Sequence, residues 1–255
     1  MPFKESNLIL NLPLVLSLTQ SFNANQRQAI ERCLRIMIGG MAEFQYKTSA
    51  KGLDSMAELD SYCYYVAGVV GEMLTSLFCG QSMAIARHRE IFEKLSVSFG
   101  QSLQLVNILK DQQEDREIEV CWLPRDLFGK YGIDDLSTYR PELRRVEFQN
   151  ALYELIAITH AHLRNAMQYI SLIPSSEPGI RRFCFWTVNL AAMTLSKIYQ
   201  NPHFTDKDEI SIPQGQVKRM LALSAIGCRS NFILHTMFNR STKGLPLANI
   251  NIGTR

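Results

Sequence analysis

A chain of 255 residues fits one large domain or two small ones and can bury a sizeable hydrophobic core. Its composition, 46% apolar and 20% charged, excludes a disordered or fibrous protein and is typical of a globular one. A formal net charge of +3, without any run of lysine or arginine, argues against nucleic acid as a partner.

The nine prolines leave long proline-free stretches between them. Because proline is excluded from helix interiors, these stretches are free to form long helices. Strand-like alternation of apolar and polar residues is nearly absent. We therefore predict an all-α fold, a single bundle of long helices around a central cavity, with residues 1–255 forming one domain.

The first apolar stretch, NLILNLPLVLSL, covers residues 7–18. Pro13 interrupts it, it is too short to span a bilayer, and no cleavage site of a signal peptide follows. We expect it to be part of the fold. The protein is therefore expected to be cytoplasmic, with peripheral contact to a membrane surface as an open alternative.

Apolar residues at three-and-four spacing predict the helices that follow. Ser55 and Glu58 form an S-x-x-E pattern that is typical of a helix N-terminus. The predicted helices cover residues 25–46, 55–78, 85–117, 142–173, 178–199 and 213–238. The six cysteines lie singly, without a C-x-x-C pair, which favours reduced thiols. We expect His160 and His162 to be structural, since two positions apart on a helix they face different ways.

The stretch from Ser61 to Met73, SYCYYVAGVVGEM, combines tyrosines with small residues. Tyr62 and Tyr65 fall on one side of the predicted helix, while Gly68 and Gly71, which have no side chains, leave part of the helix surface open to close approach. A glycine inside a helix costs about 1 kcal/mol relative to alanine. Two of them within one turn indicate close approach of either a neighbouring helix or a ligand.

The sequence NILKDQQED at residues 107–115 places two aspartates one helical turn apart. Gln104, Asn107, Asp111 and Asp115 form one polar stripe on an otherwise apolar helix, and such a helix is buried. The stripe is therefore expected to face an internal cavity, where the carboxylates need a cation. Mg²⁺ fits, because it binds one or two carboxylates together with substrate phosphates. The alternative is a solvated face near a helix end, with Lys110 and Arg116 supplying ordinary ion pairs.

Several motifs together resemble a known family. They are GGMAEF at 39–44, YCYYVAGVVG at 62–71, NILKDQQED followed by WLP at 107–124, FC at 183–184 and GQ at 215–216. In this order and spacing, over roughly residues 12–230, they resemble the squalene and phytoene synthases, and the first of them leans toward squalene synthases. The resemblance implies an all-α isoprenoid synthase fold and head-to-head condensation of two isoprenyl diphosphates.

The resemblance also implies roles for single residues. Asp111 and Asp115 match the second aspartate-rich motif, which holds Mg²⁺ against the substrate diphosphate, and Tyr62 matches the tyrosine that assists proton removal. The implied substrate-binding residues are Tyr65, Val66, Gly68, Gln104, Asn107, Lys110 and Phe183. The implied reaction joins two farnesyl diphosphates into presqualene diphosphate, which NADPH reduces to squalene in squalene synthases. Phytoene and dehydrosqualene synthases share the motifs and omit the reduction.

The chain also departs from the family pattern. A first aspartate-rich motif is expected upstream of GGMAEF, yet residues 1–38 contain no aspartate. Glu119 and Val120 stand where the family has Gly-Arg, and Thr187 and Val188 replace a usual Pro-Gln pair. We therefore expect an N-terminally shortened relative whose bare surface a partner chain could cover. A non-catalytic protein that binds isoprenoid diphosphate is a second hypothesis beside the active enzyme.

Overall fold

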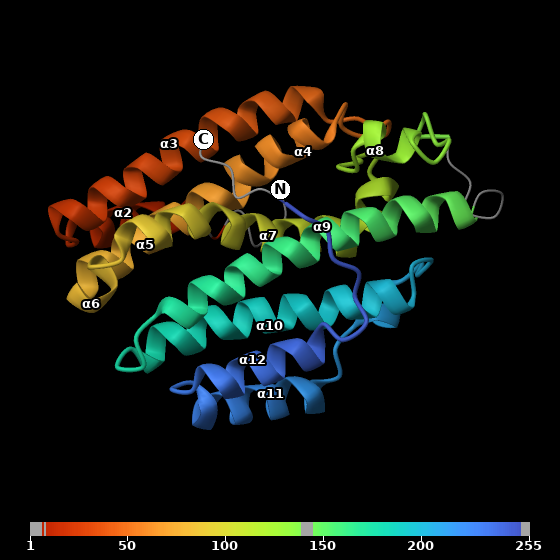
Figure 1. Ribbon diagram of the computed structural model, residues 1–255. Helices are drawn as coiled ribbons and strands as arrows, with labels where there is room; N and C mark the ends of the chain where they lie inside the picture. Colours follow the sequence, from red (N-terminus) through yellow and green to blue (C-terminus); the bar gives the residue numbers. More distant parts are fainter. Residues whose placement is uncertain (1–6, 8, 139–144, 251–255) are drawn as a thin grey trace.

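The protein is described here by a computed structural model, which covers residues 7, 9–138 and 145–250. Within these residues the regular structure is helical, and the only β-type pairing is one isolated bridge between Leu53 and Pro124. The helices lie side by side in a layered bundle (Figure 1). The predicted all-α fold is confirmed.

The N-terminal half begins with a long helix, α3 (Ala24–Lys47), which matches the predicted 25–46. Asn23 caps it, since its side chain accepts a hydrogen bond from the Gln26 amide and the Gln26 side chain accepts one in return. The predicted helix 55–78 is continuous but has three parts: α4 (Met56–Cys63), the π-helix η1 (Tyr64–Gly68) and α5 (Val69–Gln81).

The central helix is α7 (Arg89–Glu117). It contacts α5 and η1 on one side, and α9 (Arg145–Leu172) and α10 (Pro178–Gln200) on the other (Figure 1). Its predicted start at residue 85 was too early, because a separate helical turn, α6 (Met83–Ala86), precedes it. Residues 142–144, the predicted beginning of the next helix, lie outside the described residues.

The predicted helix 213–238 was wrong, since two helices occupy this region. They are α11 (Gln214–Gly227) and α12 (Asn231–Ser241). The chain turns at Gly227, where a Cβ atom would come within 2.4 Å of Ile233. Ser230 then caps α12 by accepting the Ile233 amide at 3.4 Å. Buried Arg181 donates to the carbonyl of Cys228 at 2.6 Å and fixes the turn.

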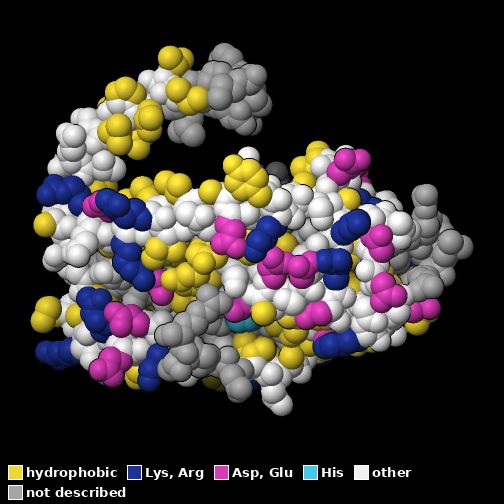
Figure 2. Space-filling view, turned by 90° about the horizontal axis from the view of Figure 1, so that it is seen from above, with side chains coloured by type: hydrophobic (Ala, Val, Ile, Leu, Met, Phe, Trp, Pro, Cys, Tyr) yellow, Lys and Arg dark blue, Asp and Glu magenta, His cyan; other side chains and the backbone are white. Residues whose placement is uncertain are grey.

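The apolar N-terminal stretch forms α2 (Leu12–Gln20), and none of its residues is buried. Figure 2 shows this segment standing away from the body of the molecule, with hydrophobic side chains on its surface. It is helical, but it contributes nothing to the core. Among the described residues, one helical stretch, Met56–Gln81, is long and apolar enough to cross a membrane. That stretch lies between α3 and α7 as part of the bundle.

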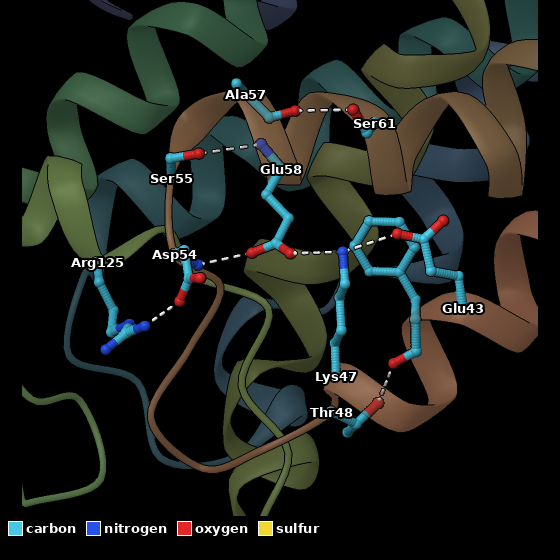
Figure 3. Close-up of polar contacts among 10 residues, drawn as sticks. Glu43, Lys47, Thr48, Asp54, Ser55, Ala57, Glu58, Ser61 and Arg125 are labelled. Atoms are coloured by element: carbon cyan, nitrogen blue, oxygen red, sulfur yellow. Dashed lines mark hydrogen bonds and ion pairs between the residues drawn. The ribbon is translucent and has the colours of Figure 1, made fainter.

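The segment before α8 (Arg125–Gly129) is held against the loop that joins α3 to α4. The Leu53 amide donates to the Leu123 carbonyl at 3.0 Å, and the Arg125 amide donates to the Leu53 carbonyl at 2.8 Å. An ion pair of Arg125 with Asp54 reinforces this pairing, and an ion pair of Lys47 with Glu58 joins α3 to α4 across the same loop (Figure 3). The backbone pairing places Trp122 against Tyr62 of α4.

His162 is half-buried in α9 and forms a hydrogen bond within the bundle. Its Nδ1 atom is 2.8 Å from the hydroxyl of Ser98 on α7, and that hydroxyl accepts a hydrogen bond from Asn165 at 3.0 Å. Burial lowers the pKa of His162 from 6.5 to about 4, although the charge of Asp60 opposes this. The folded protein therefore keeps this imidazole neutral.

The free energy of unfolding is expected to decrease as the pH is lowered, because of this histidine. Between pH 6.5 and about 4 the unfolded chain binds a proton at His162 that the folded chain does not, so acidification favours unfolding. At about 1.4 kcal/mol per pKa unit, the loss reaches about 3 kcal/mol. Urea unfolding of the wild type and of His162→Gln at several pH values measures it. In His162→Gln the free energy of unfolding should decrease much less between pH 6.5 and about 4. In the control His88→Gln, at an exposed site, it should decrease as in the wild type.

Candidate active site

The polar stripe predicted on α7 is present but not enclosed. Asn107 is exposed, Gln104 and Asp115 are half-buried, and the Asp111 side chain retains 30% of its exposure. The prediction that the whole stripe faces an internal cavity is therefore not confirmed, because Asp115 lines a cavity whereas Asn107 faces solvent. The buried face of α7 is the apolar remainder, including Leu105 and other side chains that contact the neighbouring helices.

Asp111 lies between two lysine ammonium groups. The Nζ atom of Lys207 is 2.8 Å from its Oδ1 atom, and that of Lys110 is 3.3 Å away. Lys207, from the 3-10 helix η2 (Lys207–Ile210), also forms an ion pair with Glu114. The sequence analysis placed Lys110 here but missed Lys207, which is distant in sequence and has no periodic signal around it.

Burial and neighbouring charges affect the ionisation of Asp115. Burial raises its pKa above the usual range, and the negative charge of Asp111 raises it further, while Lys207 opposes both effects. A carboxylate in this position gains from a nearby cation. The two aspartates therefore place negative charges close together that a cation would neutralise, and this is the reason for which Mg²⁺ was predicted here.

Asp111 and Asp115 fit Mg²⁺ only if a bound phosphate-containing molecule supplies further oxygen atoms to the metal ion. The described residues contain no group of three or more histidine, cysteine, aspartate or glutamate side chains that could hold a metal ion. Mg²⁺ is, however, commonly bound through one or two carboxylates, with phosphate oxygens and water supplying the rest. Asp111 and Asp115 fit that second arrangement.

Tyr62 is part of an aromatic group next to these carboxylates. Its ring stacks on Trp122, with centroids 4.0 Å apart and planes 9° from parallel, and Phe44 contacts it edge-on at 5.3 Å. Burial raises the pKa of Tyr62 to about 12, with smaller contributions from Cys63 and Asp115. The phenol is therefore protonated at neutral pH and lies within electrostatic reach of Asp115.

The remaining residues of this helix, Tyr65, Val66 and Gly68, belong to η1. A π-helical turn is rare and occurs often at functional sites. Tyr65 is covered by α3, since a Cβ atom on Gly40 would lie 2.1 Å from the Cγ atom of its ring. Val66 is half-buried, and Gly68 is buried. The tyrosine and glycine are thus packed within the bundle in this structure.

Phe183 stands apart from this group. It lies near the beginning of α10 with 46% of its surface exposed. α10 is on the opposite side of α7 from η1 (Figure 1). Among the described aromatic contacts, none joins it to Tyr62, Tyr65 or Trp122. The structure therefore does not bring Phe183 together with the other predicted site residues.

A cavity of about 990 Å³ lies at the C-terminal end of α7. Asp115 and Trp122 contribute to its wall, so the cavity adjoins the carboxylates and the aromatic group. Two arginines, Arg116 and Arg145, and the imidazole of His203 line it too. Burial lowers the pKa of His203, and the charge of Arg145 lowers it further. The sequence analysis missed Arg145 and His203, because only the tertiary fold brings them to this place.

Glu119 also lines this cavity and has an unusual backbone. Its φ angle is 60°, in the left-handed region that glycine adopts without a Cβ penalty. The family pattern has glycine at this position. The turn before Trp122 therefore keeps the conformation that glycine favours, although this chain carries a glutamate there.

Comparisons with known proteins place the chain in a family. A family model described as squalene/phytoene synthase matches residues 8–216. Squalene synthase BSS of Botryococcus braunii is 32% identical over 196 residues, which are 74% of this chain and 40% of that protein. Squalene synthase 1 of Arabidopsis thaliana is 32% identical over 179 residues, covering 69% of this chain and 41% of the relative.

A solved structure of TcSQS in complex with a ligand has the same fold, with a TM-score of 0.69 and 20% sequence identity. The alignment covers 89% of this chain and 71% of that one. The curated relatives are considerably longer, so the chain spans less than half of the length of those that it matches.

Proposed function

We propose a function for this chain on one premise: it belongs to the squalene/phytoene synthase family. The proposed reaction condenses two farnesyl diphosphates head-to-head, through presqualene diphosphate, to squalene. One observation carries the proposal within the site. Asp115, on the carboxylate stripe of α7, lines the same cavity as Trp122, on whose ring Tyr62 is stacked.

The carboxylates would bind the ionic end of the substrate. Asp111 and Asp115 would hold Mg²⁺, which supplies neutralisation of the departing diphosphate. Gln104 and Asn107 follow the same stripe with amide groups, and Lys110 adds an ammonium group close to Asp111. These three residues would contact diphosphate oxygens and fix the orientation of the reacting carbon.

The aromatic group would stabilise the carbocation that remains after the diphosphate departs. The faces of Tyr62, Trp122 and Phe44 are neighbours, and aromatic faces attract a cation by about 0.5–2 kcal/mol each. Tyr62 retains its proton at neutral pH. It can therefore accept the substrate's proton only by giving up its own proton in the same step, and an oxygen of the departed diphosphate would take that proton, because Asp115 would be committed to Mg²⁺.

Two alternatives remain within the family. A phytoene or dehydrosqualene type of enzyme would perform the same condensation without reduction by NADPH. A non-catalytic relative would bind isoprenoid diphosphate without converting it. The ion pairs of Lys207 favour this second alternative in one respect, because they already satisfy part of the charge on Asp111.

The test is incubation of the purified protein with farnesyl diphosphate, Mg²⁺ and NADPH, followed by extraction of apolar products. We expect squalene, and its formation should require both Mg²⁺ and NADPH. A C30 product with an unreduced central triene, made equally well without NADPH, would support the phytoene type. Binding of farnesyl thiodiphosphate without any turnover of farnesyl diphosphate would identify a non-catalytic relative.

A further inference from the structure

Lys207 is the feature of the site that the proposed function leaves unexplained. Its Nζ atom contacts Oδ1 of Asp111 at 2.8 Å and forms a second ion pair with Glu114. The side chain is 36% exposed. It comes from η2, a segment outside the helices that form the polar stripe. One ammonium group therefore joins two acidic side chains on the last turns of α7.

The segment that carries Lys207 is held in place from both sides. Gln113 on α7 donates to the Phe204 carbonyl at 3.0 Å, just before η2. The Glu209 carboxylate accepts the amide of Thr205 at 2.9 Å and the side-chain amide of Asn201 at 2.8 Å. These contacts build a small folded loop against α7, so that Lys207 approaches Asp111 from a supported backbone.

An ammonium group at this position competes with a divalent cation. Mg²⁺ would bind an aspartate oxygen at about 2.0–2.1 Å, and Lys207 already lies 2.8 Å from Asp111 Oδ1. Two cations that share one oxygen are within about 5 Å of each other and repel. A metal ion on Asp111 therefore has to displace Lys207, or accept a weaker position beside it.

A diphosphate removes this conflict, because it offers new oxygens to the lysine. We propose that Lys207 is a positioning residue that competes with the metal ion for Asp111, and that it moves to a phosphate oxygen when the prenyl diphosphate enters. The proposal rests on the proposed function. Its consequence is that the site binds a divalent cation weakly alone and tightly together with the diphosphate ligand.

The experiment measures Mn²⁺ binding by electron paramagnetic resonance, which needs no turnover. Lys207→Gln is expected to bind Mn²⁺ alone about tenfold more tightly than the wild type, because a neighbouring positive charge is removed. Lys207→Arg keeps that charge and should resemble the wild type. Lys130→Gln removes a surface ion pair with Glu154, 3.0 Å long, and serves as the control for net charge.

A second measurement follows the affinity for farnesyl thiodiphosphate at saturating Mg²⁺. Here the expected order reverses, and Lys207→Gln should bind about three- to tenfold more weakly than the wild type, since a charged hydrogen bond to phosphate is lost. Equal Mn²⁺ affinity of the wild type and Lys207→Gln, including no binding by either, would overturn the proposal. Failure of the wild type to bind farnesyl thiodiphosphate would instead count against the proposed function.

Discussion

Replacement of Asp111 by asparagine is expected to lower the turnover of farnesyl diphosphate at least about 100-fold. The substitution keeps the shape of the side chain and removes the negative charge that would hold the metal ion and the departing diphosphate. Folding should be little affected, because Asp111 is partly exposed and its ion pairs with Lys207 and Lys110 contribute at most about 1 kcal/mol. Turnover is measured by product extraction, and folding by thermal melting.

Glu117→Gln is the matched control for Asp111→Asn. Glu117 is an exposed acidic residue at the end of the same helix, so the control removes one negative charge from α7 outside the polar stripe. We expect it to retain most of the activity. If Asp111→Asn turned over substrate as fast as this control, the carboxylate pair would have no role in catalysis.

The main features of the bundle could be predicted from the sequence, because they depend on local patterns. Proline-free stretches and apolar residues at helical spacing indicated α3, α9 and α10 to within a few residues. The stripe on α7 followed from the same periodicity. Where the pattern was ambiguous, as between residues 213 and 238, a turn at Gly227 was missed because apolar spacing continued on both sides of it.

The partners of the stripe could not be predicted, because they arrive from segments without periodicity. Lys207 reaches Asp111 from η2, and Arg145 and His203 meet in the cavity from two different parts of the chain. Accessibility was also beyond the sequence. Whether a polar stripe opens to solvent depends on which neighbouring helices cover it, and helical spacing specifies only the face on which it lies.

Two glycines at the contact between the α4–α5 region and α7 bear on the two explanations that the sequence left open for Gly68 and Gly71. A Cβ atom on Gly71 would lie 2.0 Å from the Ser96 carbonyl oxygen, and one on Gly100 would lie 2.0 Å from that of Ala67. Both contacts are with backbone, so a neighbouring helix explains these two small residues. The close approach of η1 and α5 to α7 sets the spacing between Tyr62 and the carboxylate stripe.

Gly71→Ala is therefore expected to destabilise the protein by about 3 kcal/mol. The added methyl group meets the main chain of α7, which cannot move aside as a flexible side chain can, and overpacking of this kind typically costs about 1–3 kcal/mol or more. The free energy of unfolding, measured with urea, should fall accordingly. If the helices separate instead, the affinity for farnesyl thiodiphosphate should fall as well.

Gly80→Ala makes the same chemical change in the same helix, at a position where a Cβ atom would meet nothing within 4 Å. Alanine restricts the unfolded chain more than glycine does, so this control should be neutral or stabilise the protein by up to about 1 kcal/mol. The contrast between the two variants isolates the helix contact from glycine's flexibility. Equal stability of the two variants would show that α5 and α7 are not in backbone contact at Ser96, and the spacing between Tyr62 and the carboxylate stripe would then have to be revised.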